Sequence, residues 1–168
     1  MSTVTFKRTI NVPAERAWEI LSDYQNIQVF HPMVDRVDKL SEAASGLGAK
    51  RRCNMYDKSS AVEEVVAWSE GKGYTVIITE ATRMPVRDIT ARMSIEPVDA
   101  NSSKAGMEMT YTPTWGVIGR VMDLLIIRLM MRKTFAKVLD GLELHAKTGQ
   151  AVGKNGVLEP TASLNKAL

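Results

Sequence analysis

The residues best suited to chemistry lie between positions 51 and 64, where charged side chains and a thiol occur close together in the sequence. Arg51 and Cys53 share one face of a strand-like run over residues 47–57. A turn centred on Lys58 and Ser59 would place Glu64 opposite Cys53 and close to Arg51. Because a buried charge needs a partner, an Arg51–Glu64 pair could orient the polar head of a ligand in an apolar pocket. The alternative is that one side chain points to solvent and the other ends at the rim.

Other side chains could take part in acid–base or nucleophilic chemistry. His31 could serve as a general acid or base, or simply as a rim or capping residue. Cys53 lies two residues from Arg51 and could form a thiolate, although a small buried apolar residue is the simpler interpretation. Tyr111 could offer a hydroxyl. Catalysis would require His31, Glu64 and Tyr111 within hydrogen-bond reach of one point.

Apolar and aromatic residues would line the same space. Residues 86–97 and 107–112 alternate between apolar and polar side chains, as half-buried antiparallel strands do. Inward methionines suit an adaptable pocket, but methionine, Trp68 and Tyr111 also fill cores. The residues expected to face a ligand are Arg51, Cys53, Met55, Glu64, Val66, Trp68, Ile89, Met93, Met107, Met109, Tyr111, Met122 and Leu125.

Periodicity and turn residues predict the elements that position these side chains. A strand over residues 4–12 precedes Pro13, which suits the start of a helix over residues 14–24. A shorter helix covers residues 26–30. Six further strands are predicted over residues 34–40, 47–57, 61–68, 74–79, 86–97 and 107–112.

A helix of about eight turns is predicted over residues 117–147. Its middle is apolar nearly all round, and its core stripe consists of Ile118, Val121, Met122, Leu125, Leu129, Val138, Leu139 and Leu142. Three interpretations of its surface stay open: contact with an anionic membrane, a homodimer face, or an ordinary solvated basic face. The cations concerned are Arg120, Arg128, Arg132, Lys133 and Lys137.

The bulk composition fits one soluble domain. The chain has 168 residues, is 45% hydrophobic and carries a net charge of +3. We expect a ligand-binding domain over residues 1–147 and a flexible tail over residues 148–168. With only 6% aromatic residues and no basic–aromatic patch, nucleic acid is not an expected partner. The single cysteine excludes an intrachain disulfide, and the absence of a signal-peptide pattern favours the cytoplasm.

No metal site or cofactor is expected, because the two histidines, His31 and His145, are too far apart in sequence for local metal-ligand spacing. The longest apolar run is also too short for a membrane span.

Seven short segments, in this order and spacing, resemble a known family. The chain is similar to the polyketide cyclase/dehydrase and lipid-transport branch of the START-like (SRPBCC) superfamily, which includes the birch-pollen allergen. The resemblance covers about residues 3–147. The matching segments are residues 10–18 (INVPAERAW), 23–24 (DY), 30–34 (FHPMV), 46–51 (GLGAKR), 63–68 (EEVVAW), 84–86 (MPV) and 111–113 (YTP).

This resemblance implies an α+β helix-grip fold. In that fold a curved antiparallel sheet of about seven strands wraps a long C-terminal helix, two short helices follow the first strand, and a deep apolar pocket lies between sheet and helix. Family members carry lipids, polyketides, hormones or quinones, and a minority catalyse cyclisation or dehydration. No catalytic residue carries over by motif.

Two classes of function follow. The first, which we favour, is a non-catalytic protein that binds or transports an apolar molecule such as a lipid, polyketide or quinone. The second is a cyclase/dehydrase-type enzyme. A membrane-associated quinone or lipid chaperone is a variant of the first class.

Overall fold

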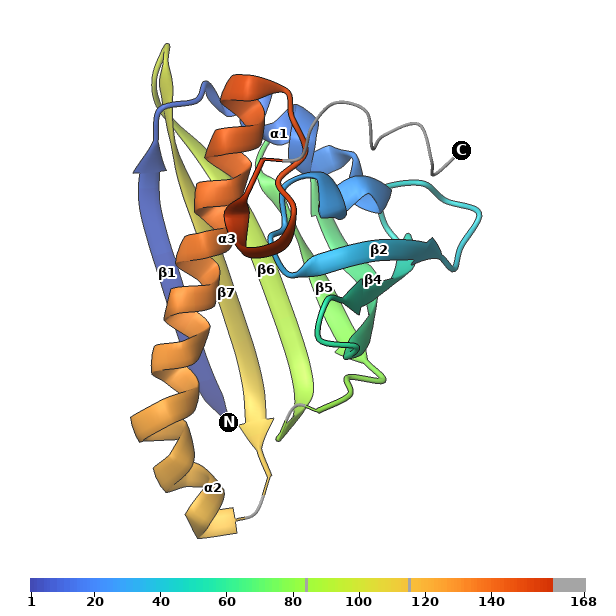
Figure 1. Ribbon diagram of the computed structural model, residues 1–168, viewed down its shortest axis with the longest axis vertical. Coiled ribbons are helices and arrows are strands. Elements are labelled where there is room, and N and C mark those ends of the chain that lie inside the picture. The colour runs from blue at the N-terminus through green and yellow to red at the C-terminus, as the bar shows by residue number, and fades with distance from the viewer. Residues whose placement is uncertain (84, 115, 159–168) are drawn as a thin grey trace.

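Seven antiparallel strands form one sheet in the order β1-β7-β6-β5-β4-β3-β2 (Figure 1). The computed structural model describes residues 1–83, 85–114 and 116–158, without the side chains of residues 117, 118 and 120. The strands are β1 (Ser2–Ile10), β2 (Val34–Lys39), β3 (Lys50–Met55), β4 (Ser60–Ser69), β5 (Gly73–Thr79), β6 (Val86–Asp99) and β7 (Ser102–Pro113).

Two short helices follow β1, and one long helical segment follows β7. The first two are α1 (Ala14–Ser22) and η1 (Tyr24–Val29). The long segment comprises α2 (Gly116–Met122), a π-helical stretch η2 (Asp123–Ile127) and α3 (Arg128–Thr148). A short η3 (Lys154–Gly156) follows. The predicted α+β helix-grip fold, with its element order, is confirmed.

Alternation places one side-chain face of the sheet against the helices. Across the sheet centre, Tyr74 on β5 pairs with Met93 on β6, Met93 with Met107 on β7, and Met107 with Phe6 on β1. Their side chains all belong to the main apolar core or pack against it. The period-2 pattern therefore decides which residues lie under the helices.

We call α1 and η1 together the brace. The long helix packs closely against the brace at a glycine, Gly141. A β-carbon on Gly141 would lie 2.1 Å from the carbonyl oxygen of Phe30, so only glycine permits this approach. Val138, Leu139 and Leu142 beside it are fully buried. This C-terminal half of α3 is thus the tightly packed half of the helix.

Residues 149–158, the first part of the expected flexible tail, pack against the brace. Val152 is fully buried, and its N–H donates to the carbonyl of Val29 at 2.8 Å. It also forms an isolated bridge with Leu158. The remainder of the expected tail, residues 159–168, lies outside the described residues.

Candidate functional site

An arginine is buried at the centre of the first polar cluster on the concave face. The Nε and Nη2 atoms of Arg51 lie 2.9 and 2.6 Å from Oε2 of Glu63, and Nη1 donates to the carbonyl of Tyr24. The guanidinium also lies 3.8 Å from the centre of the Tyr24 ring. Burial is the largest single effect and lowers the pKa of Arg51, but Glu63, together with Cys53, Tyr74 and Tyr24, raises it above its usual value. Arg51 is therefore a satisfied, charged core residue that joins β3, β4 and η1.

The predicted partner, Glu64, is wrong by one residue, because the register of the β3–β4 hairpin differs. Arg51 pairs with Glu63 and Cys53 with Ala61, so the hairpin centres on Asp57 instead of Lys58 and Ser59. Asp57 fixes this turn by accepting hydrogen bonds from both the N–H and the hydroxyl of Ser59.

The register change turns Glu64 and Val66 away from the core. Glu64 instead forms a half-exposed ion pair with Lys50 at 3.4 Å, and Val66 is exposed. Trp68 nevertheless faces inward as predicted, because a bulge between Val65 and Ala67 restores the alternation. A shift in register by an odd number of residues turns the side chains of a strand to the other face of the sheet. One bulge turns the residues that follow it back again.

Aromatic rings fill the space near Arg51. Trp68 lies edge-on to Trp18 with ring centres 5.0 Å apart and stacks on Tyr74 at 5.7 Å. Tyr74 in turn lies edge-on to Tyr24, and its hydroxyl lies 3.2 Å from the sulfur of Met93. This end of the sheet is consequently packed with side chains.

His31 and Cys53 are buried and uncharged beside this cluster. Burial, with a smaller effect of Arg51, lowers the pKa of His31 to about 4. Burial, with Glu63, raises the pKa of the Cys53 thiol to about 12. A thiol held protonated in this way is a poor nucleophile. Met55 is half-buried and packs against the same core.

The three candidate catalytic residues are not brought together. Glu64 faces away from the core, and His31 lies in the turn before β2, next to the Arg51 cluster. Tyr111 belongs to a second, separate apolar cluster near the other end of the sheet. The acid–base set that the enzyme interpretation required is therefore dispersed.

A second polar cluster surrounds Asp123, a residue that is not among the predicted site residues. Asp123 is buried, and it accepts hydrogen bonds from the Ser2 hydroxyl at 2.6 Å, from the Tyr111 hydroxyl, and from Arg128 Nε at 3.2 Å. Burial would raise the pKa of Asp123, but these three donors lower it below its usual value. Burial and the carboxylate raise the pKa of Tyr111. The cluster ties the start of β1 and the end of β7 to the helix.

A cleft opens beside Asp123, with a volume of about 680 Å³. It combines apolar side chains with hydroxyl and guanidinium groups. Its lining consists of Met1, Ser2, Arg87, Thr112, Pro113, Thr114, Gly116, Asp123, Leu124 and Arg128. The available signal was Asp123 itself, the only acidic residue between positions 109 and 139 of the sequence. A lone carboxylate within an apolar helix indicates a special environment.

The remaining predicted ligand-facing residues divide between core and surface. Ile89 and Tyr111 are buried in the second cluster, with Met107 and Met109 packed against it. Met93 is buried in the main core, and Met122 is half-buried. Val121, Leu125 and Leu129 were expected in the core stripe, but they are 53%, 66% and 55% exposed because this part of the helix lies outside the tightly packed region.

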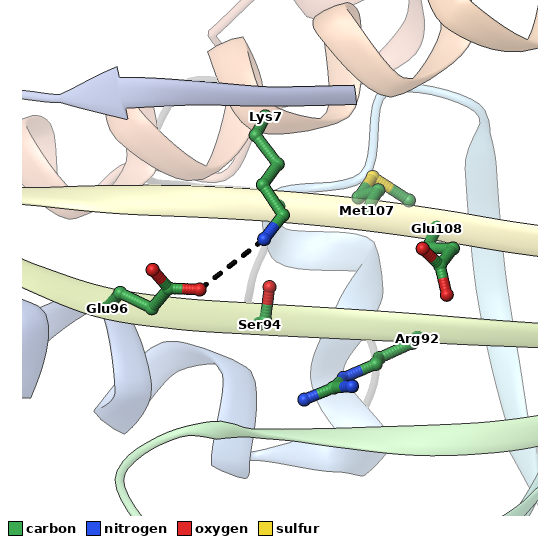
Figure 2. Close-up of a pocket in the computed structure, with 7 residues that line it drawn as sticks. Lys7, Arg92, Ser94, Glu96, Met107 and Glu108 are labelled. Carbon is green, nitrogen blue, oxygen red and sulfur yellow. Dashed lines mark hydrogen bonds and ion pairs between the residues drawn. The ribbon is translucent and has the colours of Figure 1, made fainter. Parts of the chain in front are cut away.

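The opposite face of the sheet holds a smaller hollow, of about 80 Å³ (Figure 2). It lies where Gly106 on β7 has no side chain between Lys7 and Ser94. Lys7 crosses it to reach Glu96 at 3.4 Å. Drug-sized ligands occupy about 300–1,000 Å³, so this hollow is too small to hold one.

A family model described as polyketide cyclase / dehydrase and lipid transport matches residues 1–147. No curated protein matches the chain in a sequence comparison. In the part of the chain that the structure describes, no group of three or more His, Cys, Asp or Glu residues could hold a metal ion. No helix there is long and apolar enough to cross a membrane.

Several solved structures share this fold. A START superfamily protein from Mycobacterium smegmatis is 14% identical with a TM-score of 0.70, over 86% of this chain and 97% of that one. Ara h 8.0201 is 14% identical with a TM-score of 0.69, over 88% and 98%. A point mutant of norcoclaurine synthase from Thalictrum flavum, bound to a transition-state analogue, is 10% identical with a TM-score of 0.66, over 88% and 95%. At these identities the likeness shows the fold alone.

Proposed function

The chain belongs to the polyketide cyclase/dehydrase and lipid transport family, and on that premise we propose that it binds or transports an apolar small molecule with one polar group. Family and fold support a START-like domain that binds hydrophobic ligands. A lipid, a polyketide or a quinone-like molecule fits this description. We place the ligand at the Asp123 end of the space between sheet and helix.

The observation that carries this proposal is the cleft beside Asp123. Its volume of about 680 Å³ lies within the range of small-molecule sites, about 300–1,000 Å³. It adjoins the second apolar cluster, because Asp123 accepts a hydrogen bond from Tyr111 of that cluster. An amphipathic molecule would have both an apolar wall and polar groups within reach.

Polar residues at this end can orient the ligand. Ser2, Tyr111 and Arg128 all donate to Asp123, which holds them in fixed positions. The side chain of Arg128 is 42% exposed and lines the cleft, so its guanidinium can also donate to a carbonyl or hydroxyl of the ligand. The chain ends of an apolar ligand would contact Pro113 and Leu124.

The Arg51 end is a less suitable place for a ligand. Its charges satisfy each other, and aromatic rings occupy the surrounding space. We therefore assign Arg51 and Glu63 a structural role. Catalysis is the second candidate, but its predicted acid–base residues, His31, Glu64 and Tyr111, are not brought together.

A fluorescence titration with cis-parinaric acid, an apolar polyene acid, tests the site. Leu124→Arg places a charge on the cleft wall and is expected to weaken binding about tenfold or more. The matched control, Leu47→Arg, changes an equally exposed leucine on a distant loop and should leave affinity unchanged. Unchanged affinity in Leu124→Arg, or equal losses in both variants, would contradict this location.

A further inference from the structure

The helix after β7 exposes six large apolar side chains within one short stretch. They are all at least 48% exposed, whereas soluble proteins usually expose such residues singly. We call this set the helix patch. It consists of Val121, Leu124, Leu125, Ile126, Leu129 and Met130.

The helix patch lies at one end of the molecule. Figure 1 shows α2 beyond the ends of β1 and β7, at the opposite end from the β6–β7 turn. The tightly packed part of α3, around Gly141, is several turns away. Val121 lies in α2, and the other five patch residues lie in η2 and the first turn of α3, where their exposure leaves them free to approach a flat surface.

The charge around the helix patch has one sign. Arg132, Lys133 and Lys137 are exposed on the following turns, and Arg128 is partly exposed within the patch. Asp123, the only acidic residue between positions 109 and 139, is buried and already bonded to three donors. Asp123 therefore offsets Arg128 alone, and residues 124–139 hold no carboxylate to offset Arg132, Lys133 and Lys137.

We propose that the helix patch is a docking surface for an anionic lipid bilayer. Apolar side chains next to a set of lysine and arginine residues are the combination that binds acidic membrane surfaces. A second copy of the chain fits less well, because a two-fold interface would bring Arg132 and Lys133 of both copies together, with no acidic partner between residues 124 and 139.

The dimensions agree with shallow insertion. Residues 121–130 span about 14 Å along the helix, and interfacial helices bury their apolar side chains about 5–10 Å deep. Arg132 and Lys133 follow within one turn, where their long side chains reach the headgroups. Lys137 lies about one turn further along the helix.

Docking would also place the cleft mouth at the membrane. Leu124 belongs to both the helix patch and the cleft lining. An apolar ligand could then pass between bilayer and protein without crossing water. The docking surface itself does not depend on the proposed ligand site, since its apolar and charged residues lie mainly outside the cleft.

Vesicle co-sedimentation tests the docking surface. The protein is mixed with vesicles of phosphatidylcholine alone, or of phosphatidylcholine with phosphatidylserine, at low and high salt. We expect binding to the acidic vesicles only, weakened by salt. Ile126→Ser with Met130→Ser should reduce partitioning about tenfold or more, and Arg132→Gln with Lys133→Gln about fivefold for each cation. Matched controls at the other end, Val98→Ser and Lys104→Gln, should bind as the unaltered protein does.

Two results would overturn the proposal. One is no binding to acidic vesicles, or binding that the patch variants and the controls share equally. The other is a concentration-dependent dimer in analytical ultracentrifugation that Ile126→Ser with Met130→Ser abolishes, which would make a second copy the occupant. Binding of cis-parinaric acid in solution, measured on the same variants, separates this outcome from failure of the ligand site, because neither residue lines the cleft.

Discussion

Arg51 and Glu63 form a buried ion pair across β3 and β4, in which Nε and Nη2 of the arginine approach the same carboxylate oxygen at 2.9 and 2.6 Å. The side chain of Arg51 is 2% exposed and that of Glu63 15%. The pair also anchors η1, because Nη1 donates to the carbonyl of Tyr24. Its position in the packed end of the sheet makes it a structural element of the domain.

Breaking this pair is expected to destabilise the fold. Arg51→Met or Glu63→Gln leaves a buried charge without its partner, which costs about 3–5 kcal/mol of the free energy of unfolding. Glu64→Gln is the matched control: it affects a half-exposed pair with Lys50 and should cost less than about 1 kcal/mol. Urea unfolding measures all three. Equal losses for Glu63→Gln and Glu64→Gln would contradict the observed register.

The stability of the protein should fall as the pH drops below about 6.5, because of His31. Its folded-state pKa of about 4 lies below the ordinary value of 6.5, so the unfolded chain takes up a proton first. The stabilisation is present above pH 6.5 and is lost progressively towards pH 4, by about 3 kcal/mol in total.

Urea unfolding at pH values between 7 and about 4.5 checks this effect, because carboxylates contribute mainly below that window. His31→Gln should flatten the pH dependence of stability within the window, and His145→Gln should retain it. A slope that persists in His31→Gln would assign the effect to other groups.

Cys53 should resist alkylation in the native protein. Burial and Glu63 raise the pKa of its thiol to about 12, so almost no thiolate forms at pH 8. We expect iodoacetamide to modify the native protein only as fast as it opens, and to modify it readily in urea. Intact-mass spectrometry follows the reaction. Rapid native labelling would show that Cys53 is accessible and reactive.

Gly141→Ala should destabilise the protein, although alanine normally favours a helix by about 1 kcal/mol. The added β-carbon would lie 2.1 Å from the carbonyl oxygen of Phe30, and a backbone atom cannot move aside easily. We expect a thermal unfolding midpoint several degrees lower. An unchanged or higher midpoint would mean that α3 is not held against η1 by this contact.

Much of the fold could be predicted from sequence, because its elements have clear periods and boundaries. Alternation in residues 86–97 and 107–112 gave the correct inner face, and Pro13 marks the start of α1. The β3–β4 register could not be predicted, because Lys58 adopts a left-handed φ of 66° that its residue type does not indicate. The bulge between Val65 and Ala67 could not be predicted either, because an alternating pattern does not show where a strand contains an extra residue.

The candidate site was harder to predict than the fold. The helical period correctly identified Val138, Leu139 and Leu142 as core. It also assigned Val121, Leu125 and Leu129 to the core stripe, and these three are exposed. The helical period identifies the apolar side of a helix, but it does not show which part of that helix packs against the sheet. Asp123 could not be identified as a site residue from periodicity, because its partners Ser2 and Tyr111 are distant in the sequence and only the tertiary fold brings them to it.

Native mass spectrometry of the protein purified from its host, followed by organic extraction, tests the central claim most directly. We expect one apolar molecule with a polar group bound per chain. We also expect that Leu124→Arg loses this molecule while Leu47→Arg keeps it. A protein that is empty in every preparation and takes up no added lipid, polyketide or quinone, or a ligand retained equally by both variants, would contradict the account.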